Sequence, residues 1–443
     1  MIRLVAKAKR HWVAHHCALL VALTVGWPSL GLGDQADIVI SNAKVISPPH
    51  TVIDNGTIVV IKGKITYVGP YRKEANAKRS IDAGGRAVIP GLIDTHVHLN
   101  IDPLPSQDLY ERWIEQRSGE LLRDYLSRGF TTIQSLGDYW PGVLELRERI
   151  QARQIAGPRL LIAGPLITPP HGHAAAYSPM CAQRPLCSKS GWYREVSDEK
   201  EARALIRELA ALHVDAIKIA NEPTTSTDGK PLGFAPGVLH ALIEEAHLHD
   251  LRVYVHPASV DYAIEAIQAG ADALAHGPGI EFFLPNRSDT PGNALEPLVK
   301  IATDRHIPIS TTIVGPLGNY LDAQKTVVLL RDVKLLFDRG ITLGFGTDSI
   351  GEAIASQKEF EALARSGLTP MQALQVATLN AARELGRDRE IGSLEAGKRA
   401  DLVIVATDPL QSIEFLDRID LVVKDGEIVF DYYAEANSRT SGR

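Results

Sequence analysis

The chain has 443 residues, of which 45% are hydrophobic and 23% charged, and its formal net charge is −6. This composition is typical of a soluble globular protein large enough for one large domain and a smaller one. A nucleic-acid-binding domain needs a basic patch that this charge balance does not indicate, so nucleic acid is not an expected partner.

The N-terminus resembles a targeting segment. Lys7, Lys9 and Arg10 precede the apolar run 17–27, and small residues follow at 31–33. A basic start, a short apolar stretch and small residues predict a signal peptide over residues 1–33. The apolar run is short for a bilayer span, although an uncleaved anchor is the alternative. We therefore expect an exported, periplasmic protein with no stable membrane insertion once the leader is removed.

Two cysteines, Cys181 and Cys187, remain after the predicted leader. In an oxidising compartment they could form a small-loop disulfide. The sequence does not report the geometry that a disulfide requires, so two free thiols are an equal alternative.

The two ends of the remaining chain share a β-rich pattern. Residues 36–69 alternate apolar and polar side chains around Lys62–Gly63, and residues 400–430 do so around Asp425–Gly426. Short turns of this kind between alternating runs indicate hairpins. This pattern predicts one small sheet domain that is built from both chain ends.

The middle region alternates strand-like and helical patterns. Helical runs include 199–213, 236–250 and 260–271, and 168–196 is a long insertion rich in Pro, His and Cys. Strands are expected at 88–98, 130–136, 159–167, 215–220, 251–256, 272–276, 307–313 and 341–348. Eight such strands favour a (β/α)8 TIM barrel, with an open doubly wound sheet as the second choice.

Titratable side chains lie at or near the ends of several of these strands. Active sites of TIM barrels lie at the carboxyl ends of the strands, so these residues should meet there. His96 and His98 share one strand face because they are two residues apart, and imidazole and carboxylate groups suit zinc and similar divalent ions. The candidate metal ligands are His96, His98, Lys218, His256, His276 and Asp348.

Lys218 lies in the middle of the strand-like segment VDAIKIA. Burial disfavours the ammonium form of a lysine, so a packed strand is an unusual position for this side chain. A lysine that reaches into the pocket or pairs with a carboxylate is the structural alternative to a role in the site.

Several motifs together resemble the amidohydrolase superfamily, and in particular its imidazolonepropionase-like and prolidase-like branch. They are PGLIDTHVHLN, VDAIKIA, VYVHP, ALAHG, GFGTDS and the tail ATLNAARELGR with IGSLEAGKRADLVIV. The resemblance implies a β-sandwich domain from residues 34–88 and 391–435, and a metal-dependent hydrolase TIM barrel over 89–390. It also implies two divalent metal ions, with zinc expected.

The resemblance assigns a role to each candidate ligand. His96, His98 and Asp348 would bind the more buried ion, and His256 and His276 the more exposed one. Lys218, carboxylated by carbon dioxide, would bridge the two ions. Carboxylation converts a cation into an anion that two metals can neutralise, and a buried lysine readily loses the proton that blocks this reaction.

The expected activity is that of a binuclear amidohydrolase acting on a small molecule. A metal-bridged hydroxide would cleave an amide C–N bond, in a dipeptide or an N-acyl amino acid, with Asp348 as general base and then acid. His171, His173 and Tyr177 in the insertion are candidate substrate-binding residues. In VHPAS, Pro257 departs from the VHAHG-like run of many relatives, which weakens any transfer of substrate preference.

Three other interpretations are open. A mononuclear imidazolonepropionase-like ring-opening hydrolase or deaminase would use His96, His98, His276 and Asp348, and it would have no role for Lys218. An esterase, lactonase or carbamate hydrolase would use the whole site. A non-catalytic binding scaffold would be expected to lack some of the ligands, all of which are present here. The sequence leaves homo-oligomerisation open.

Overall fold

The computed structural model describes residues 35–73, 76–100, 107–172, 191–221, 224–225, 231–277, 295–315, 323–411 and 418–434. All of them belong to one compact unit, Gln35–Arg443. The predicted leader and the cysteines Cys181 and Cys187 lie outside the described residues. Among the helices that are described, none is both long and apolar enough to cross a membrane.

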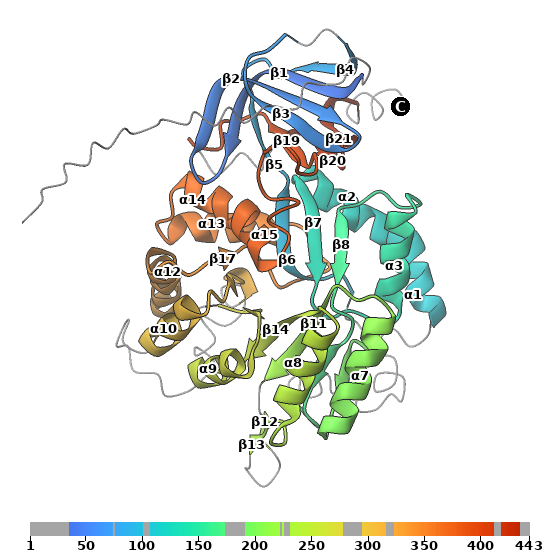
Figure 1. The fold of residues 1–443 in the computed structure, drawn as a ribbon, viewed down its shortest axis with the longest axis vertical. Coiled ribbons are helices and arrows are strands. Elements are labelled where there is room, and N and C mark those ends of the chain that lie inside the picture. Colours follow the sequence, from blue (N-terminus) through green and yellow to red (C-terminus); the bar gives the residue numbers. More distant parts are fainter. Residues whose placement is uncertain are drawn as a thin grey trace, which may run out of the picture. The chain divides into compact units, whose positions relative to one another are not determined.

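An eight-stranded sheet contains strands from both ends of the chain (Figure 1). The order along its main path is β21-β20-β19-β5-β1-β2-β3, and β4 pairs with β1. The N-terminal strands are β1 (Ala36–Ser47), β2 (Thr51–Ile61), β3 (Lys64–Pro70), β4 (Ala77–Asp82) and β5 (Ala87–Pro90). The C-terminal strands are β19 (Leu402–Val405), β20 (Ile419–Lys424) and β21 (Glu427–Asp431). We call this sheet the terminal sheet.

Two tight turns set the hairpins of the terminal sheet. Lys62 and Gly63 join β2 to β3 with φ of 50° and 76°, and Asp425 and Gly426 join β20 to β21 with φ of 51° and 77°. Two successive positive φ angles fit the strongly twisted hairpin turns that favour Gly and Asp. The apolar residues of alternate positions, among them Ile40, Val45, Ile58, Ile404 and Val423, are buried together in one cluster.

The middle of the chain forms two parallel sheets. The four-stranded sheet has the order β18-β6-β7-β8, from β6 (Leu92–His98), β7 (Phe130–Ser135), β8 (Arg159–Ile162) and β18 (Ser349–Ile350). The seven-stranded sheet has the order β10-β9-β11-β14-β15-β16-β17. Its strands are β9 (Leu166–Thr168), β10 (Tyr193–Glu195), β11 (Ala216–Asn221), β14 (Arg252–Pro257), β15 (Ala273–Leu274), β16 (Ile309–Ser310) and β17 (Leu343–Gly344). The short pair β12 (Thr224–Thr225) and β13 (Pro231–Leu232) is antiparallel.

Backbone hydrogen bonds connect the two parallel sheets along both seams. The Thr95 N–H donates to the Phe345 carbonyl at 2.8 Å on one side. On the other side, the Asp215 N–H donates to the Ile162 carbonyl at 2.7 Å. At each seam, the edge of one sheet is therefore hydrogen-bonded to the edge of the other and is not free.

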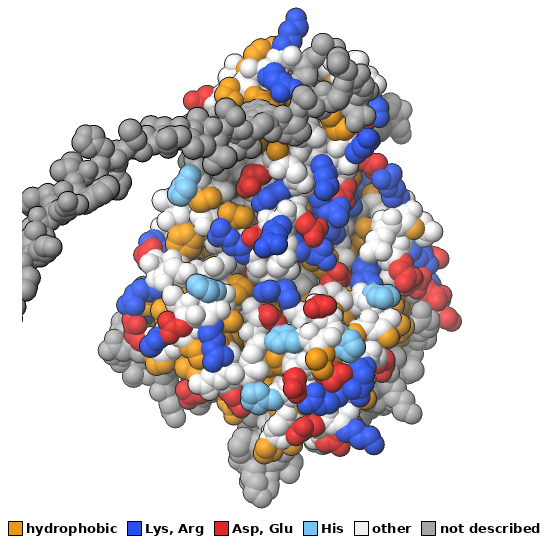
Figure 2. Space-filling view, viewed as in Figure 1, with side chains coloured by type: hydrophobic (Ala, Val, Ile, Leu, Met, Phe, Trp, Pro, Cys, Tyr) orange, Lys and Arg blue, Asp and Glu red, His pale blue; other side chains and the backbone are white. Residues whose placement is uncertain are grey.

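Helices alternate with the parallel strands and cover their outer side (Figure 1). They are α1 (Gln107–Trp113), η1 (Ile114–Ser118), α2 (Gly119–Ser127), α3 (Gly142–Gln151), α7 (Glu199–Ala211), α8 (Val238–Leu248), α9 (Val260–Ala269), α10 (Glu296–Asp304), α12 (Ala323–Asp338), α13 (Ala355–Arg365), α14 (Pro370–Gln375), η3 (Val376–Asn380) and α15 (Ala381–Glu384). Local sequence explains several starts, because Asp198 and Ser259 cap α7 and α9 through their side chains. The outer faces carry charge, and Figure 2 shows basic and acidic side chains interspersed on one of them.

Three of the predicted strands, 272–276, 307–313 and 341–348, are shorter in the structure, and two others are each divided into two strands. The strand expected at 88–98 is two strands, because β5 pairs with β1 and β19 of the terminal sheet while β6 pairs with β7. Gly91 lies between them, and a Cβ at this position would lie 2.1 Å from Thr131 Oγ1. Only glycine allows this close approach. Likewise, the strand expected at 159–167 is β8 followed by β9, with Gly164 between them at φ +73°.

Arg159, at the start of β8, fastens the parallel strands to the terminal sheet. Its guanidinium donates to Asp401 at 2.7 Å and to Asp425 at 2.7 Å, and both partners come from the C-terminal part of the chain. The Asp401 side chain is only 3% exposed, so this pair is largely shielded from solvent. A guanidinium that binds two carboxylates, one of them shielded from solvent, fixes geometry more strongly than a single surface pair.

Candidate metal centre

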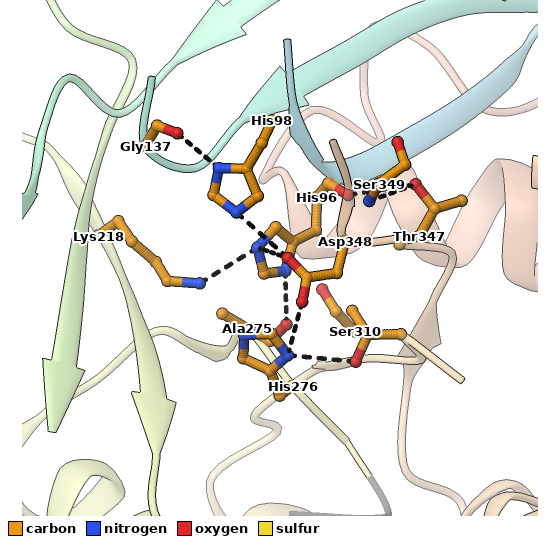
Figure 3. Close-up of polar contacts among 12 residues, drawn as sticks. His96, His98, Gly137, Lys218, Ala275, His276, Ser310, Thr347, Asp348 and Ser349 are labelled. Atoms are coloured by element: carbon orange, nitrogen blue, oxygen red, sulfur yellow. Dashed lines mark hydrogen bonds and ion pairs between the residues drawn. The ribbon is translucent and has the colours of Figure 1, made fainter. Parts of the chain in front are cut away.

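His96 and His98 project from one face of β6 toward the centre of the site (Figure 3). The residue between them, Val97, is buried in the apolar core on the other face, as strand alternation requires. The His96 side chain is fully buried and the His98 side chain is 12% exposed. The two imidazoles therefore lie at the inner end of the site, where side-chain packing restricts their motion.

Backbone carbonyls fix the orientation of both rings. His96 Nδ1 lies 2.8 Å from the Ala275 carbonyl oxygen, and His98 Nδ1 lies 2.5 Å from the Gly137 carbonyl oxygen. A carbonyl only accepts hydrogen bonds, so each Nδ1 carries the proton. This leaves both Nε2 atoms facing the site, which is the arrangement that histidine ligands of metals adopt.

Asp348 completes a compact group of three. Its Oδ1 lies 3.1 Å from His96 Nε2 and 3.1 Å from His98 Nε2. One potential ligand atom from each of these three residues lies within 4.8 Å of the others. Two imidazole lone pairs and a carboxylate oxygen at such distances repel each other unless a cation or a proton lies among them. The donor set therefore fits a divalent metal such as zinc.

Buried hydrogen bonds explain the position of Asp348 between β17 and β18. Its N–H donates to the His96 carbonyl at 2.8 Å, and its φ of +53° is one that Asp tolerates better than most residues. The preceding Thr347 donates from its backbone at 3.1 Å and from its hydroxyl at 2.8 Å to the buried Asp94. Asp94, two residues before His96, thereby ties the two ligand-bearing segments together.

Burial and neighbouring charge favour the metal-binding protonation states of His96 and Asp348, but not that of His98. Burial and the nearby Lys218 hold the pKa of His96 well below its usual value, so its imidazole is neutral. Burial opposes ionisation of Asp348, but the surrounding imidazoles outweigh it and hold its pKa well below the usual value. Burial would lower the pKa of His98, but its hydrogen bond to Asp348 raises it instead. A proton on His98 is the competitor that a metal would displace.

Lys218 lies in the same cluster. Its residue is 2% exposed, and its Nζ lies 3.3 Å from His96 Nε2 (Figure 3). Burial lowers the pKa of Lys218 to about 7, although the charges of Asp348 and Glu384 act in the opposite direction. A large fraction of the side chain is therefore the neutral, nucleophilic amine near neutral pH.

His276 and His256 extend the cluster toward solvent. His276 Nδ1 lies 3.8 Å from Asp348 Oδ2, and its ring centroid is 4.7 Å from that of His96. The His256 ring centroid is 4.3 Å from that of His276. In the β11–β14 pairing, Lys218 lies opposite Tyr254 and Ala220 opposite His256, which puts Lys218 and His256 on one face of the sheet. The structure thus brings together all six candidate ligands.

The candidate substrate-binding residues are not part of this cluster as far as the structure describes them. His171 lies in a turn after β9 with φ of +58°, its side chain is exposed, and its N–H donates to Glu195 at 3.0 Å. His173 and Tyr177 lie outside the described residues. Their proposed roles stay predictions.

Sequence reasoning missed the residues that support the candidate ligands. Every residue has a backbone carbonyl, so the residue types do not indicate that those of Ala275 and Gly137 bind the histidines. Only the fold shows this. Glu384 accepts from the Ser310 hydroxyl at 2.5 Å, in the buried layer beneath the ligands. Glu359 accepts from the backbone N–H groups that follow β16. A carboxylate on the apolar face of a helix was the signal that could have found both.

Parallel strands that alternate with helices, and a His-His-Asp group at their carboxyl ends, are typical of TIM-barrel-like α/β proteins that hold divalent metals. A model of the Amidohydrolase family matches residues 87–429, and the chain therefore belongs to this family. The protein is accordingly a hydrolytic enzyme with a TIM-barrel-like α/β fold. Divalent metals are the cofactors that this family generally uses.

Individual relatives are distant but cover most of the chain. The imidazolonepropionase of Shouchella clausii (strain KSM-K16) is 23% identical over 430 residues, which span 86% of each chain. The ochratoxinase of Aspergillus niger is 24% identical over 425 residues, which span 86% of this chain and 84% of the relative. The crystal structure of a Xaa-Pro dipeptidase with methionine bound in its active site superposes with a TM-score of 0.73 at 24% identity. It covers 88% of this chain and 99% of that chain.

Proposed function

We propose that the protein is a binuclear metal-dependent hydrolase that cleaves an amide C–N bond in a dipeptide or an N-acyl amino acid. The observation that carries this proposal is the buried Lys218, whose Nζ lies 3.3 Å from His96 Nε2 in the six-residue cluster. A one-metal site needs no lysine there, whereas a two-metal site gains a bridging anion from it. The similarity to a Xaa-Pro dipeptidase supports the dipeptide class.

The six residues divide into two ligand sets that share Lys218. His96, His98 and Asp348 would hold the inner ion, and His256 and His276 the outer one. Zinc is the expected metal for this mixture of imidazole and carboxylate ligands. When bound, such ions lower the pKa of a coordinated water and polarise a carbonyl oxygen.

Lys218 would become a ligand by reacting with carbon dioxide. The lone pair of its neutral amine forms a bond to the carbon, one C=O electron pair moves onto oxygen, and the nitrogen releases a proton. The product is a carbamate with the charge of a carboxylate. The pKa of Lys218, which burial lowers to about 7, supplies the required neutral amine.

Asp348 would transfer the proton during hydrolysis. Its Oδ1 faces both His96 and His98, whereas Oδ2 lies on the side of His276. As the water oxygen bonds to the amide carbon, the C=O electron pair moves onto the carbonyl oxygen, and Asp348 accepts a water proton. When the C=O bond forms again and the C–N bond breaks, the C–N electron pair stays on nitrogen, and Asp348 passes that proton to it. The products are a carboxylic acid and an amine.

The main alternative is a mononuclear imidazolonepropionase-like ring-opening hydrolase or deaminase, which the similarity to imidazolonepropionase favours. It would use His96, His98, His276 and Asp348 and leave Lys218 without a metal to bind. An esterase, lactonase or carbamate hydrolase would use the same residues as the leading proposal. Metal content and the state of Lys218 distinguish the mononuclear enzyme from the leading proposal. Substrate tests distinguish the esterase, lactonase and carbamate hydrolase from it.

The deciding experiment is metal analysis of the purified protein together with a crystallographic check of Lys218. Two metals per chain and carboxylate density on Lys218 are expected, and one metal with an unmodified lysine would favour the main alternative. A dipeptide and N-acyl amino acid library then tests the substrate class. We expect the D348N variant to retain bound metal and lose turnover, so full activity of this variant would disprove the role of Asp348.

We further propose that the two parallel sheets form a closed eight-stranded barrel and that the terminal sheet is the core of a β-sandwich domain. The backbone bonds along both seams support the first proposal. We also propose export to the periplasm, for which the leader-like pattern of residues 1–33 is the support. Sequencing the N-terminus of the mature protein would test it.

A further inference from the structure

Ile350 is an exposed apolar side chain next to the metal-ligand cluster. It lies two residues after Asp348 and is 56% exposed. Single exposed apolar residues are common on protein surfaces, so exposure alone carries no meaning. The position of Ile350 in the strand pairing is what makes it informative.

Strand pairing puts Ile350 on the side of the ligands. In the parallel β18–β6 pair, Ser349 lies opposite Val97 and Ile350 opposite His98. Paired residues of adjacent strands point to the same face of a sheet, and neighbours along a strand point to opposite faces. The Ser349 hydroxyl meets the buried Tyr125 hydroxyl of α2 at 3.0 Å, on the helix-covered side. Ile350 therefore shares the face of His98, toward the site.

Gly315 borders the other ligand oxygen of Asp348. A Cβ built on Gly315 would lie 3.8 Å from Asp348 Oδ2, which is ordinary van der Waals contact. The missing side chain therefore leaves space beside the oxygen that faces His276. The Ile313 and Val314 N–H groups, just before Gly315, both donate to the buried Glu359, so the loop is held in this place.

We propose that Ile350 and Gly315 form a subsite for an uncharged, apolar group on the amine half of the substrate. This inference rests on the proposed function, in which Asp348 protonates the leaving nitrogen. Substituents of that nitrogen must then lie beside the Asp348 carboxylate. Ile350 is two residues along the chain, roughly 6–7 Å between Cα atoms at most, which is within reach of an amino-acid side chain.

Introducing a positive charge at the subsite gives a test that a general loss of structure would not mimic. The measured quantity is the ratio of kcat/KM for N-acetyl-leucine to that for N-acetyl-aspartate, on zinc-loaded protein. We expect the wild type to prefer the leucine compound and I350K to lower the ratio about tenfold or more. V327K is the matched control, because Val327 on α12 is 67% exposed and lies outside the cluster. It should leave the ratio unchanged.

Binding of the amine products provides a readout that does not need turnover. Calorimetry of free leucine and free aspartate with zinc-loaded wild type and I350K should show leucine binding more tightly to the wild type and a reversed or reduced preference in the variant. G315V should weaken leucine binding more than glycine binding, because the added side chain fills the space beside Asp348. Equal affinities in the wild type, or an I350K preference like that of V327K, would overturn the subsite.

The two proposals fail differently. If no amide of the library is cleaved while leucine still binds in an Ile350-dependent way, the proposed reaction is wrong and the apolar subsite stands. If amides are cleaved and neither Ile350 nor Gly315 affects the preference, the reaction stands and the subsite is wrong.

Discussion

Replacing Glu359 should lower the stability of the protein and its kcat without changing its metal content. Glu359 lies on α13 and is fully buried. Its Oε1 accepts from the Ile313 N–H at 3.0 Å and its Oε2 from the Val314 N–H at 2.9 Å. The same loop contains Thr312, whose φ is +41° and whose hydroxyl lies 3.4 Å from His276 Nδ1. One carboxylate thus holds a strained loop against the site.

The size of the effect follows from the two hydrogen bonds. Each bond to a charged acceptor contributes about 1.5–3 kcal/mol, and its loss leaves a buried N–H without a partner. E359A should therefore lower the free energy of unfolding by about 3–6 kcal/mol. E359Q retains one acceptor oxygen but turns an amide donor toward the second N–H, so we expect roughly half of that loss.

The assay is urea unfolding of the metal-free protein at pH 8, with kcat and zinc content measured on the loaded protein. E359Q should lower kcat while zinc content stays unchanged, because Glu359 supports the loop and is not one of the candidate ligands. E361Q is the control, since Glu361 is exposed on the same helix and should change stability by less than about 0.5 kcal/mol. Equal stability of E359Q and E361Q would refute this reasoning.

Three further changes test a shielded ion pair, a buried carboxyl group and the apolar core by urea unfolding of metal-free protein. R159A should lower the free energy of unfolding by about 3–5 kcal/mol, because it leaves the buried Asp401 without its partner. R153A, the control, removes an exposed ion pair and should lower the free energy of unfolding by less than about 1 kcal/mol. Similar losses in the two variants would contradict this prediction. Burial raises the pKa of Glu384 from 4.5 to about 7, so the folded state binds more protons than the unfolded state in this window and wild-type stability falls as pH rises through it. As pH rises from 4.5 to 7, the free energy of unfolding of E384Q should therefore increase by about 3 kcal/mol relative to that of the wild type. A difference between the two proteins that does not change with pH would disprove this prediction. F360A should cost about 3–5 kcal/mol by removing a fully buried ring, and a loss near 1 kcal/mol would show that the site collapses to fill the cavity.

The candidate ligands were predictable because each lies at a local, repeating signal. A strand that ends in His-x-His or in Gly-Thr-Asp shows a candidate ligand in the residue order, and the alternation with helices indicates that parallel strand ends converge. Lys218 was predictable for a similar reason. Burial in an apolar strand disfavours the charged form of a lysine, so a lysine at this position indicates a functional role. The structure brings these residues together from β6, β11, β14 and the segments after β15 and β17.

Strand boundaries were less predictable because they depend on partners distant in sequence. The mostly apolar residues 88–93 lead directly into the histidine-bearing segment. Only the pairing of β5 with β19, more than 300 residues later, divides the run 88–98 at Gly91. Glu359 and Glu384 lay within helical patterns whose charged residues are mostly solvated. Their burial against Ile313 and Ser310 depends on how α13 and α15 pack on the strands.

By itself, the sequence indicated the chemistry proposed for this protein, because the types and spacing of His96, His98, Lys218 and Asp348 define a set of candidate metal ligands whatever their exact surroundings. The tertiary structure alone decided how that set is held and what it faces. The carbonyls of Gly137 and Ala275 orient the two imidazoles, and the pairing of β18 with β6 turns Ile350 toward the site. Coordination is a property of side-chain type, whereas orientation and exposure arise only from contacts between segments far apart in the chain.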